Sequence, residues 1–250
     1  MSIRWTYVFV DRPVGLLAPA RDFWTAATAT RLSEPRGERG EFGTLLPRAE
    51  GADPWVKVQG VGAGDGGAHL DFAVDDVPGF VVSALRHGAR SVAEHDGWAV
   101  LRSPAGQLFC AVPWQQETVR GPVVDGSRLD QVCLDLAPSV FDAEVAFWSG
   151  LLGENGWDSA VGSRPEFHVL KPPPGLPVRV LVQRLGDERP ASAHLDLACA
   201  DIGATRARHE RLGAVLVAEH THWSVLRDPV GGTYCLTGRD PETGGLPPRT

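Results

Sequence analysis

Apolar and polar residues follow a regular order along the second half of the chain. Residues 131–136 alternate with a period of two, so that one valine and two leucines share one face of a predicted strand. Residues 140–152 carry apolar side chains at helical spacing, and Gly153 predicts the end of that helix. Further strands are predicted at residues 167–170, 178–182, 194–199, 223–226 and 233–236, with a second helix at 201–212.

The first half of the chain shows the same order. It is predicted to form strands at residues 5–10, near Phe42 and Val56, and at 69–74, 98–101 and 107–112, with helices at 16–28 and 77–87. Each half therefore reads as two βαβββ modules. The whole chain reads as four such modules, which predicts an α+β fold.

The chain also contains its own sequence twice. Residues 88–112 recur at residues 213–237, with 13 of 25 positions identical. An offset of 125 residues likewise maps His69 onto His194, and an offset of 124 maps Phe23-Trp24 onto Phe147-Trp148 and Gln59 onto Gln183. A period this long exceeds that of a solenoid repeat and indicates a duplicated domain. We expect domains at 1–114 and 129–238, a polar linker at 115–128 and a flexible tail at 239–250.

Composition narrows the class of protein. Of the 250 residues, 43% are hydrophobic and 22% are charged, as is usual for a soluble globular protein. The net charge of −7 and the scattered basic residues argue against a nucleic-acid partner, and no apolar stretch suits a membrane span. The first residues lack the layout of a signal peptide, and the four cysteines form no CxxC pair. We therefore expect a cytoplasmic protein with reduced thiols.

Several strings in the second half resemble a known superfamily. They are residues 182–184 (VQR), 193–197 (AHLDL), 212–214 (LGA) and 226–236 (LRDPVGGTYCL). In this order they are similar to the glyoxalase-like branch of the vicinal oxygen chelate superfamily, which includes glyoxalase I, bleomycin- and fosfomycin-resistance proteins and extradiol dioxygenases. The resemblance implies tandem glyoxalase-like domains, each with two βαβββ modules whose curled mixed sheets surround a cleft. It does not specify a reaction, because this fold hosts enzymes and plain binding proteins alike.

The resemblance also implies metal-ligand positions. The fifth-strand ligand position falls on His69 in the first half and on His194 in the second. The last-strand position, a glutamate in that superfamily, falls on Cys110 and Cys235. One histidine and one thiol would suit zinc better than harder metals, but two donors make a weak site. Both cysteines can instead be small buried apolar residues. We expect no obligatory cofactor, with zinc, iron or manganese as the metals to test.

The first-strand ligand position lacks a histidine in both halves. It falls on Gln131 in the second half and on Trp5 or a neighbour in the first. Other candidate ligand-binding residues are the amides Gln59 and Gln183 and the aromatic residues Trp98 and Trp223. Strand-edge hydrogen bonding and core packing are the alternative roles. The Glu-His pairs at 94–95 and 219–220 can lie at a rim or in a solvated turn.

A His-x-Asp pair occurs once in each half. Strand alternation places His69 with Asp71, and His194 with Asp196, on the face opposite the residues that should pack under the helices. Each pair can therefore project into the cleft as a metal ligand or as a general base oriented by its carboxylate. The alternative is a hydrogen-bonded pair retained from an ancestral metal site.

Three functions follow from these observations. The first is a protein that binds a small aromatic or antibiotic-like molecule, with degenerate metal-ligand positions. The second is a lyase, isomerase or dioxygenase that uses a His/Cys metal site or metal-free His/Asp acid–base chemistry. The third is a structural or regulatory module whose clefts are filled by side chains. We expect a small-molecule ligand, no nucleic-acid or membrane partner, and a monomer or homodimer.

Overall fold

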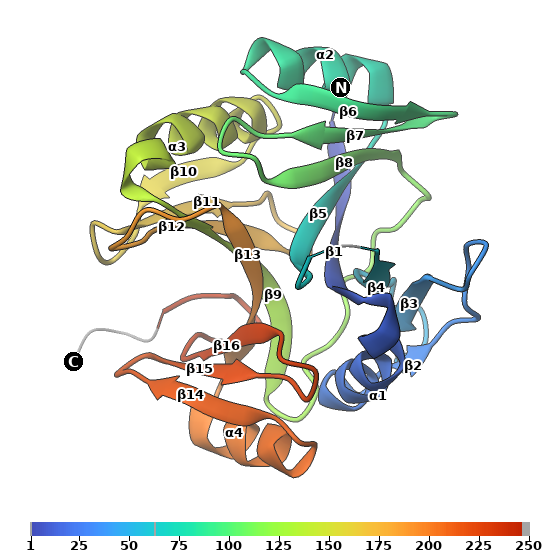
Figure 1. The fold of residues 1–250 in the computed structure, drawn as a ribbon, viewed down its shortest axis with the longest axis vertical. Helices are drawn as coiled ribbons and strands as arrows, with labels where there is room; N and C mark the ends of the chain where they lie inside the picture. The colour runs from blue at the N-terminus through green and yellow to red at the C-terminus, as the bar shows by residue number, and fades with distance from the viewer. Residues whose placement is uncertain (1, 63, 247–250) are drawn as a thin grey trace. The chain divides into compact units, whose positions relative to one another are not determined.

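The computed structural model describes residues 2–62 and 64–246, and its elements follow the predicted order of four modules (Figure 1). The first module is β1 (Ile3–Pro13), the 3-10 helix η1 (Val14–Leu16), α1 (Leu17–Ala27), β2 (Arg31–Leu32), β3 (Phe42–Leu46) and β4 (Val56–Val61). The second is β5 (Gly67–Val74), α2 (Val77–Arg86), β6 (Arg90–His95), β7 (Trp98–Arg102) and β8 (Leu108–Pro113). The third is β9 (Ser127–Leu136), α3 (Pro138–Gly153), β10 (Asp158–Val161), β11 (Phe167–Lys171) and β12 (Arg179–Arg184). The fourth is β13 (Ser192–Cys199), α4 (Ile202–Arg211), β14 (Val215–Glu219), β15 (Trp223–Arg227) and β16 (Thr233–Thr237).

Each half of the chain forms one mixed sheet of eight strands. The strand order is β2-β3-β4-β1-β5-β8-β7-β6 in the first half and β10-β11-β12-β9-β13-β16-β15-β14 in the second. β5 and β8 run parallel, as do β13 and β16, whereas the hairpin strands of each module run antiparallel. The α+β fold with two repeated sheets is therefore confirmed, and none of the described helices is long and apolar enough to cross a membrane.

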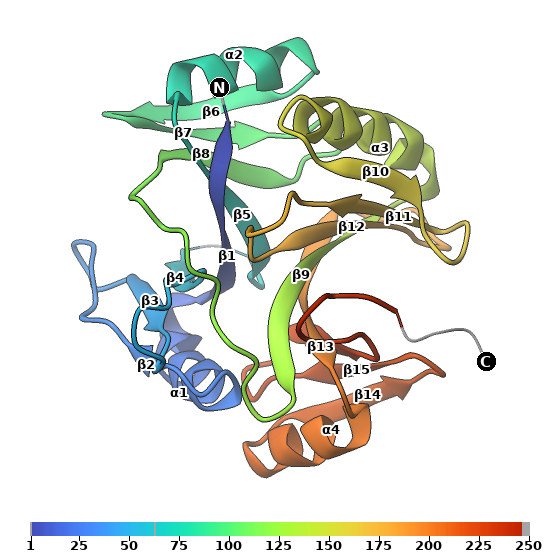
Figure 2. The ribbon, with the colours of Figure 1, turned by 180° about the vertical axis from the view of Figure 1, so that it is seen from behind.

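The compact units of the structure combine modules from different halves. Unit 1 comprises the chain up to Val8, His69–Thr118 and Val132–Ala193, so it contains the second and third modules. Unit 2 comprises Phe9–Ala68, Val119–Gln131 and the chain from His194 onwards, and so contains the first and fourth modules. The helices lie on the strands of their own modules, as α2 does on β6–β8 and α4 on β14–β16 (Figures 1 and 2).

The duplicated helices begin and end in the same way. Asp76 precedes α2 and its carboxylate accepts a hydrogen bond from the Gly79 amide at 3.0 Å; Asp201 does the same before α4. These carboxylates satisfy amides that a helix leaves without partners in its first turn. After the helices, Gly88 and Gly213 have φ of +109° and +97°, which favour glycine. Local sequence therefore marks where both helices begin and end.

In unit 1 a buried carboxylate joins the third module to the second. Trp148 of α3 packs against Phe72 and Phe109, and its indole N–H donates to Glu144 at 2.8 Å. The other oxygen of Glu144 accepts from the backbone amide of Ala105, in the turn between β7 and β8, at 2.8 Å. Burial raises the pKa of Glu144.

Unit 2 has an equivalent arrangement of tryptophan, carboxylate and turn, which we call the helix–turn joint. In unit 1 the carboxylate belongs to the helix, whereas in unit 2 it belongs to the turn. Trp24 of α1 packs against Tyr234 and donates its indole N–H to Asp228 at 3.1 Å. Asp228 lies in the turn between β15 and β16, and its other oxygen accepts from the amide of Gly232 at 2.8 Å. The buried guanidinium of Arg12 donates to Asp228 at 2.9 and 2.7 Å. The helix–turn joint is therefore present in both units. Its carboxylate has neutral hydrogen-bond donors in unit 1 and a charged guanidinium in unit 2.

The outer strands of the two sheets are the elements that the sequence does not locate. These strands are β2, β6, β10 and β14. β6 and β10 are largely exposed on both faces, so neither shows the alternation that marks a half-buried strand. β9 differs in the opposite way: all ten of its residues are buried, and it begins at Ser127 rather than at residue 131. Within the expected tail at 239–250, Arg239 is buried and bonds Asp130 through two N–H groups at 2.6 Å; residues 247–250 lie outside the described residues.

We expect Asp228→Asn to lower the free energy of unfolding by about 3 kcal/mol, because the buried Arg12 would lose its counter-charge. Glu144→Gln should cost less, about 1–2 kcal/mol, because the amide oxygen keeps one of the two hydrogen bonds and no buried charge loses its counter-charge. Urea denaturation of the two variants measures the difference. Equal costs would show that Arg12 contributes little to the joint in unit 2.

A buried histidine makes unit 2 sensitive to acid. His209 of α4 is fully buried, and its Nδ1 shares a hydrogen bond of 2.9 Å with the hydroxyl of Tyr234. Burial, and secondarily the charge of Arg208, lowers the pKa of His209 from 6.5 to about 4. Between these values the unfolded chain binds the proton and the folded chain does not, so stability rises with pH across this window.

Lowering the pH from 7 to 5 should therefore reduce the free energy of unfolding by about 2 kcal/mol through His209. Denaturation curves at several pH values test this against His209→Gln, which keeps a polar side chain but does not titrate. The variant should be less stable at pH 7 and should lose this part of the pH dependence. If both proteins show the same slope between pH 7 and 5, another group is responsible.

Candidate functional site

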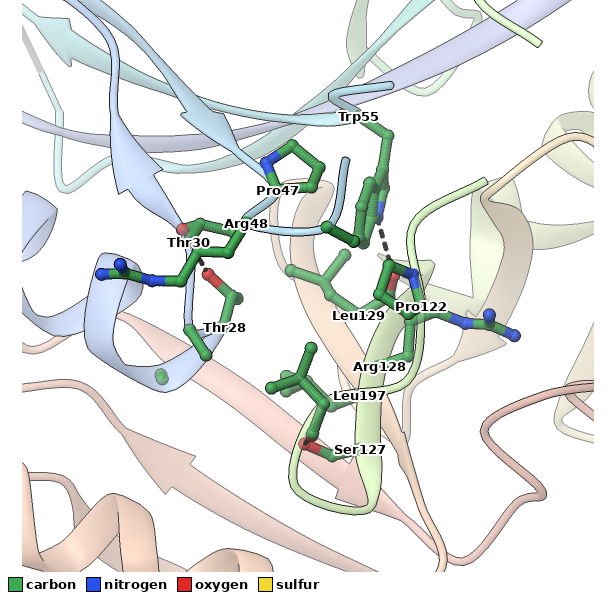
Figure 3. Close-up of a pocket in the computed structure, with 14 residues that line it drawn as sticks. Thr28, Thr30, Pro47, Arg48, Trp55, Pro122, Ser127, Arg128, Leu129 and Leu197 are labelled. Carbon is green, nitrogen blue, oxygen red and sulfur yellow. Dashed lines mark hydrogen bonds between the residues drawn. The ribbon is translucent and has the colours of Figure 1, made fainter. Parts of the chain in front are cut away.

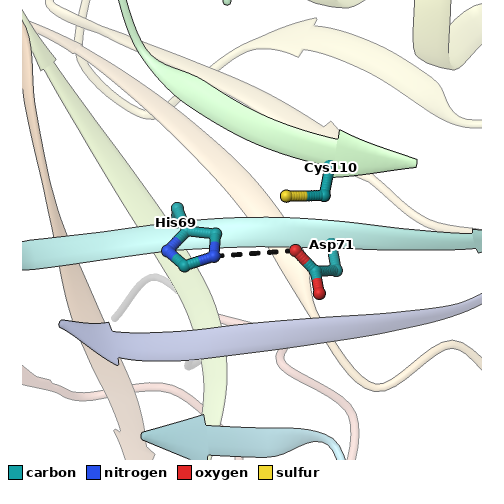
Figure 4. Close-up of side chains that lie close together, drawn as sticks. All are labelled: His69, Asp71 and Cys110. Atoms are coloured by element: carbon teal, nitrogen blue, oxygen red, sulfur yellow. Dashed lines mark ion pairs between the residues drawn. The ribbon is translucent and has the colours of Figure 1, made fainter. Parts of the chain in front are cut away.

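Three predicted site residues come together in unit 1. His69 and Asp71 project from the same face of β5, and Asp71 pairs in register with Cys110 on the parallel strand β8 (Figure 4). The imidazole Nε2 of His69 lies 3.6 Å from Oδ1 of Asp71. One nitrogen, one sulfur and one carboxylate oxygen from these side chains lie within 4.8 Å of one another.

The same three residue types come together in unit 2. Asp196 of β13 pairs in register with Cys235 of β16, and Nε2 of His194 lies 3.3 Å from Oδ1 of Asp196. The Cys235 sulfur lies 3.4 Å from that same Nε2. We call the two groups the His–Asp–Cys centres; their side chains are mostly buried, with His69 and His194 the most accessible. The sequence predicts two candidate metal donors in each half, a histidine and a cysteine. The structure brings a carboxylate oxygen of the aspartate within 4.8 Å of both.

The geometry of unit 2 differs from that of a nucleophilic triad. In such a triad one imidazole nitrogen faces the nucleophile and the other faces the carboxylate. Here Nε2 of His194 faces both Cys235 and Asp196, and its single proton cannot bond both. Nitrogen, sulfur and oxygen that converge on one point instead resemble the donors around a cation.

The aspartates supply a second observation that fits a metal. Oδ1 of Asp71 and Oδ1 of Asp196 are buried and have no hydrogen-bond partner among the described residues. A buried carboxylate oxygen that accepts no hydrogen bond is costly unless a cation faces it, either a protonated imidazole or a metal ion. A metal ion between the three donors of each centre would satisfy this oxygen, and nitrogen, thiolate and carboxylate donors together suit zinc.

The first-strand positions distinguish the two centres. In unit 2 the amide of Gln131 donates to Oδ2 of Asp196, which leaves Oδ1 directed towards the histidine. The Phe-Trp offset of 124 residues places Tyr7 at the equivalent position in unit 1. Tyr7 donates its hydroxyl to Glu117 instead. Trp5, which the resemblance suggested for this position, has a side chain that is 1% exposed.

The other predicted amides lie on the fourth strand of their modules. Gln59 pairs with Phe42 in unit 2, and Gln183 pairs with Phe167 in unit 1, so the duplication extends to strand register. The side-chain oxygen of Gln183 accepts from the thiol of Cys133 at 3.5 Å. Cys133 was not among the predicted site residues, although strand alternation places it on the face of Gln131 and Asp135.

The predicted tryptophans lie beside the centres on the same face of the sheet. Val100 pairs with Cys110, and Trp98 is two residues from Val100, so Trp98 is the diagonal neighbour of Cys110 at roughly 7–8 Å. The imidazole of His95 stacks on Trp98 with ring centroids 3.9 Å apart. Unit 2 repeats this arrangement: Trp223 neighbours Cys235 diagonally and stacks on His220 at 4.4 Å.

Paired βαβββ modules with mixed eight-stranded sheets and a His-x-Asp strand in each half define a protein of the vicinal oxygen chelate superfamily. The family model described as a glyoxalase-like domain matches residues 7–112 and, separately, residues 131–237. The chain belongs to this glyoxalase-like domain family, with one copy of the domain in each half.

Solved structures with the same fold are distant in sequence. The 2,2',3-trihydroxybiphenyl 1,2-dioxygenase from Sphingomonas wittichii is 14% identical, with 94% of this chain and 90% of that chain covered and a TM-score of 0.63. A Mn(II)-bound glyoxalase from Novosphingobium aromaticivorans is 17% identical, with 99% and 87% covered and a TM-score of 0.59. A xylose isomerase-like TIM barrel/4-hydroxyphenylpyruvate dioxygenase fusion protein is 12% identical over 94% of this chain and 48% of its own length, with a TM-score of 0.59. No curated protein sequence matches this chain.

Proposed function

We propose that this protein binds a small planar molecule with oxygen donors at its His–Asp–Cys centres, through a divalent metal held by each centre. The observation that carries the proposal is the buried Oδ1 of Asp71 and of Asp196, which has no hydrogen-bond partner among the described residues and faces a histidine nitrogen and a cysteine sulfur. Three protein donors with a further coordination position left open suit a metal that also binds a ligand.

Zinc is the metal that these donors favour. Thiolate and imidazole are soft or intermediate ligands, whereas manganese and magnesium prefer sites made of oxygen donors. When bound, such a metal acts as a Lewis acid that polarises a ligand oxygen. Replacement of the superfamily's last-strand glutamate by Cys110 and Cys235 would shift the metal preference towards zinc.

The centre in unit 2 should bind metal more tightly than the centre in unit 1. Gln131 holds Asp196 through Oδ2 and so fixes the direction of Oδ1. Outer partners of this kind orient a metal ligand and commonly change affinity by about tenfold or more. In unit 1 the equivalent Tyr7 bonds Glu117, so Asp71 lacks this support from its first strand.

The tryptophan beside each centre indicates the shape of the ligand. Trp98 and Trp223 each have one stacked imidazole and lie diagonally next to a cysteine of a centre, on the same face of the sheet. An indole at this distance can stack on a planar ring whose oxygens reach the metal. The similar fold of a dioxygenase named for a trihydroxybiphenyl supports a hydroxylated aromatic ligand.

An enzyme of lyase, isomerase or dioxygenase type is the second candidate. It is favoured by the third donor that the structure adds to each centre, because a catalytic metal site needs about three protein ligands and an open position. In such an enzyme His194 and Asp196 would hold the metal and Gln131 would orient the carboxylate. Turnover of hydroxylated aromatic compounds by metal-loaded protein would favour the enzyme over the binding protein.

Protein purified without chelator should bind about two zinc ions per chain, one for each centre. Cys110→Ser and Cys235→Ser should each remove about one equivalent, with the tighter equivalent lost in Cys235→Ser. Elemental analysis and zinc titration measure both effects. Cobalt-loaded protein should also show thiolate-to-metal absorption that each serine variant reduces.

Cys199→Ser is the matched control for the metal measurement. Cys199 is buried on the same strand as His194, lies outside both centres, and has its pKa raised to about 11 by burial. Its replacement should leave the metal content at wild-type level. Wild-type protein that takes up no zinc, cobalt or manganese would rule out the metal-dependent proposal.

Zinc-loaded protein should bind catechol, a probe with adjacent hydroxyls, more tightly than the metal-free protein does. Trp98→Ala and Trp223→Ala should each weaken this zinc-dependent binding by about fivefold at their own centre, through loss of ring stacking. Calorimetry measures the affinity, and zinc content should stay unchanged. Trp114→Ala, at a tryptophan that contacts Arg4, is the control. Equal catechol binding with and without zinc would contradict the role of the metal.

A further inference from the structure

Unit 2 contains an apolar pocket of about 150 Å³ (Figure 3). Trp55, Leu129 and Leu197 form one side of it, and Thr28 and Thr30 line the opposite side. An apolar cavity of roughly this volume is large enough for a single aromatic ring.

The pocket is separate from the His–Asp–Cys centre of its unit. Leu197 lines the pocket, whereas Asp196, the preceding residue of β13, belongs to the centre. Successive residues of a strand project to opposite faces of the sheet. The pocket therefore lies on the face of β13 that turns away from the centre.

The duplication shows how the same space is filled elsewhere in this chain. Offsets of 124 and 125 residues relate four pocket residues to residues of unit 1, and each residue of unit 1 has the larger side chain. The pairs, with the pocket residue first, are Ala27 and Leu151, Thr28 and Leu152, Leu129 and Trp5, and Leu197 and Phe72. These counterparts are exposed by 1% or less. Phe72 also contacts the rings of Trp148 and Trp157. At these four positions unit 1 thus carries larger buried side chains, and unit 2 carries smaller ones that line the pocket.

Trp55 provides a rigid wall to this hollow. Its indole N–H donates to the carbonyl of Leu129 at 2.9 Å, so its polar atom is satisfied within the protein. Gly121 lies against the ring so closely that a Cβ there would be 2.0 Å from it. Held at both points, the ring of Trp55 has little freedom and offers an ordered surface for another ring.

Thr28 and Thr30 place hydroxyl groups on one side of the pocket. The hydroxyl of Thr28 donates its proton to the carbonyl of Trp24 at 2.6 Å. It must therefore accept in its contact with the hydroxyl of Thr30 at 2.9 Å, so Thr30 is the donor there. With its proton committed, the oxygen of Thr30 can only accept a further hydrogen bond. A bound molecule that forms a hydrogen bond with Thr30 must therefore supply an O–H or N–H.

From these observations we infer that unit 2 binds a small, uncharged, single-ring aromatic molecule with a hydroxyl donor, that is, a phenol. The ring packs against Trp55, Leu129 and Leu197, and the hydroxyl donates to Thr30. The site is independent of the metal and of the ligand proposed for the His–Asp–Cys centres.

Metal-free protein titrated with phenol in a calorimeter tests the inference. The double variant Ala27→Leu/Leu197→Phe places the residues of unit 1 in the pocket and should weaken phenol binding by about tenfold or more. Thr30→Val should weaken binding of phenol by about fivefold and leave binding of toluene unchanged, because toluene cannot donate a hydrogen bond. His194→Gln should leave phenol binding intact, which separates this pocket from the centre.

The inference is wrong if the wild-type protein does not bind phenol at millimolar concentration. It is also wrong if phenol binding survives the double variant or is lost in His194→Gln, since the phenol would then occupy another site. If the double variant does not fold, crystals of the wild-type protein under xenon pressure provide the test. They should show xenon beside Trp55, and its absence would mean that the pocket is closed.

Discussion

The architecture of each unit depends on one interaction, in which a buried carboxylate accepts the indole N–H of a helix tryptophan and a backbone amide of a turn in another module. Glu144 does this for Trp148 and the turn at Ala105, and Asp228 does it for Trp24 and the turn at Gly232. A buried carboxylate is costly unless donors surround it, so its burial couples the packing of the helix to that of the turn. Modules from different halves of the chain are thereby joined into one core.

The two copies of the joint show how a duplicated fold can diverge without loss of its architecture. In unit 1 the carboxylate belongs to the helix and has neutral partners, whereas in unit 2 it belongs to the turn and is paired with the buried Arg12. The His–Asp–Cys centres diverge in the same manner, because Gln131 orients Asp196 while Tyr7 bonds Glu117. The pocket beside Trp55 extends the pattern, since small side chains there stand where unit 1 has large ones. Comparison of equivalent positions in the two units therefore shows which side chains have changed while the fold stayed the same.

Much of the fold could be predicted from the pattern of side chains, and the exceptions have a physical cause. The four helices, the β5 and β13 strands and the pairing of His with Asp on one face follow from local spacing and from capping residues such as Asp76 and Asp201. β6 and β10 lacked a pattern because edge strands exposed on both faces need no apolar face. Arg239, in the segment expected to be a tail, is buried because Asp130 pairs with its guanidinium, and the pattern of neighbouring residues does not reveal such a distant partner.

The sequence by itself determined the duplicated modules, the order of elements and the identity of the histidines, aspartates and cysteines on each sheet face, because alternation and the internal repeat are properties of the chain. Only the tertiary structure decided that a module of one half forms a compact unit with a module of the other. It also decided that the aspartate oxygen lies near the histidine and cysteine, and that unit 2 has an apolar pocket beside Trp55. These results depend on distances between residues far apart in the sequence. Such distances are set by packing and by the pairing of buried polar groups, which no local pattern records.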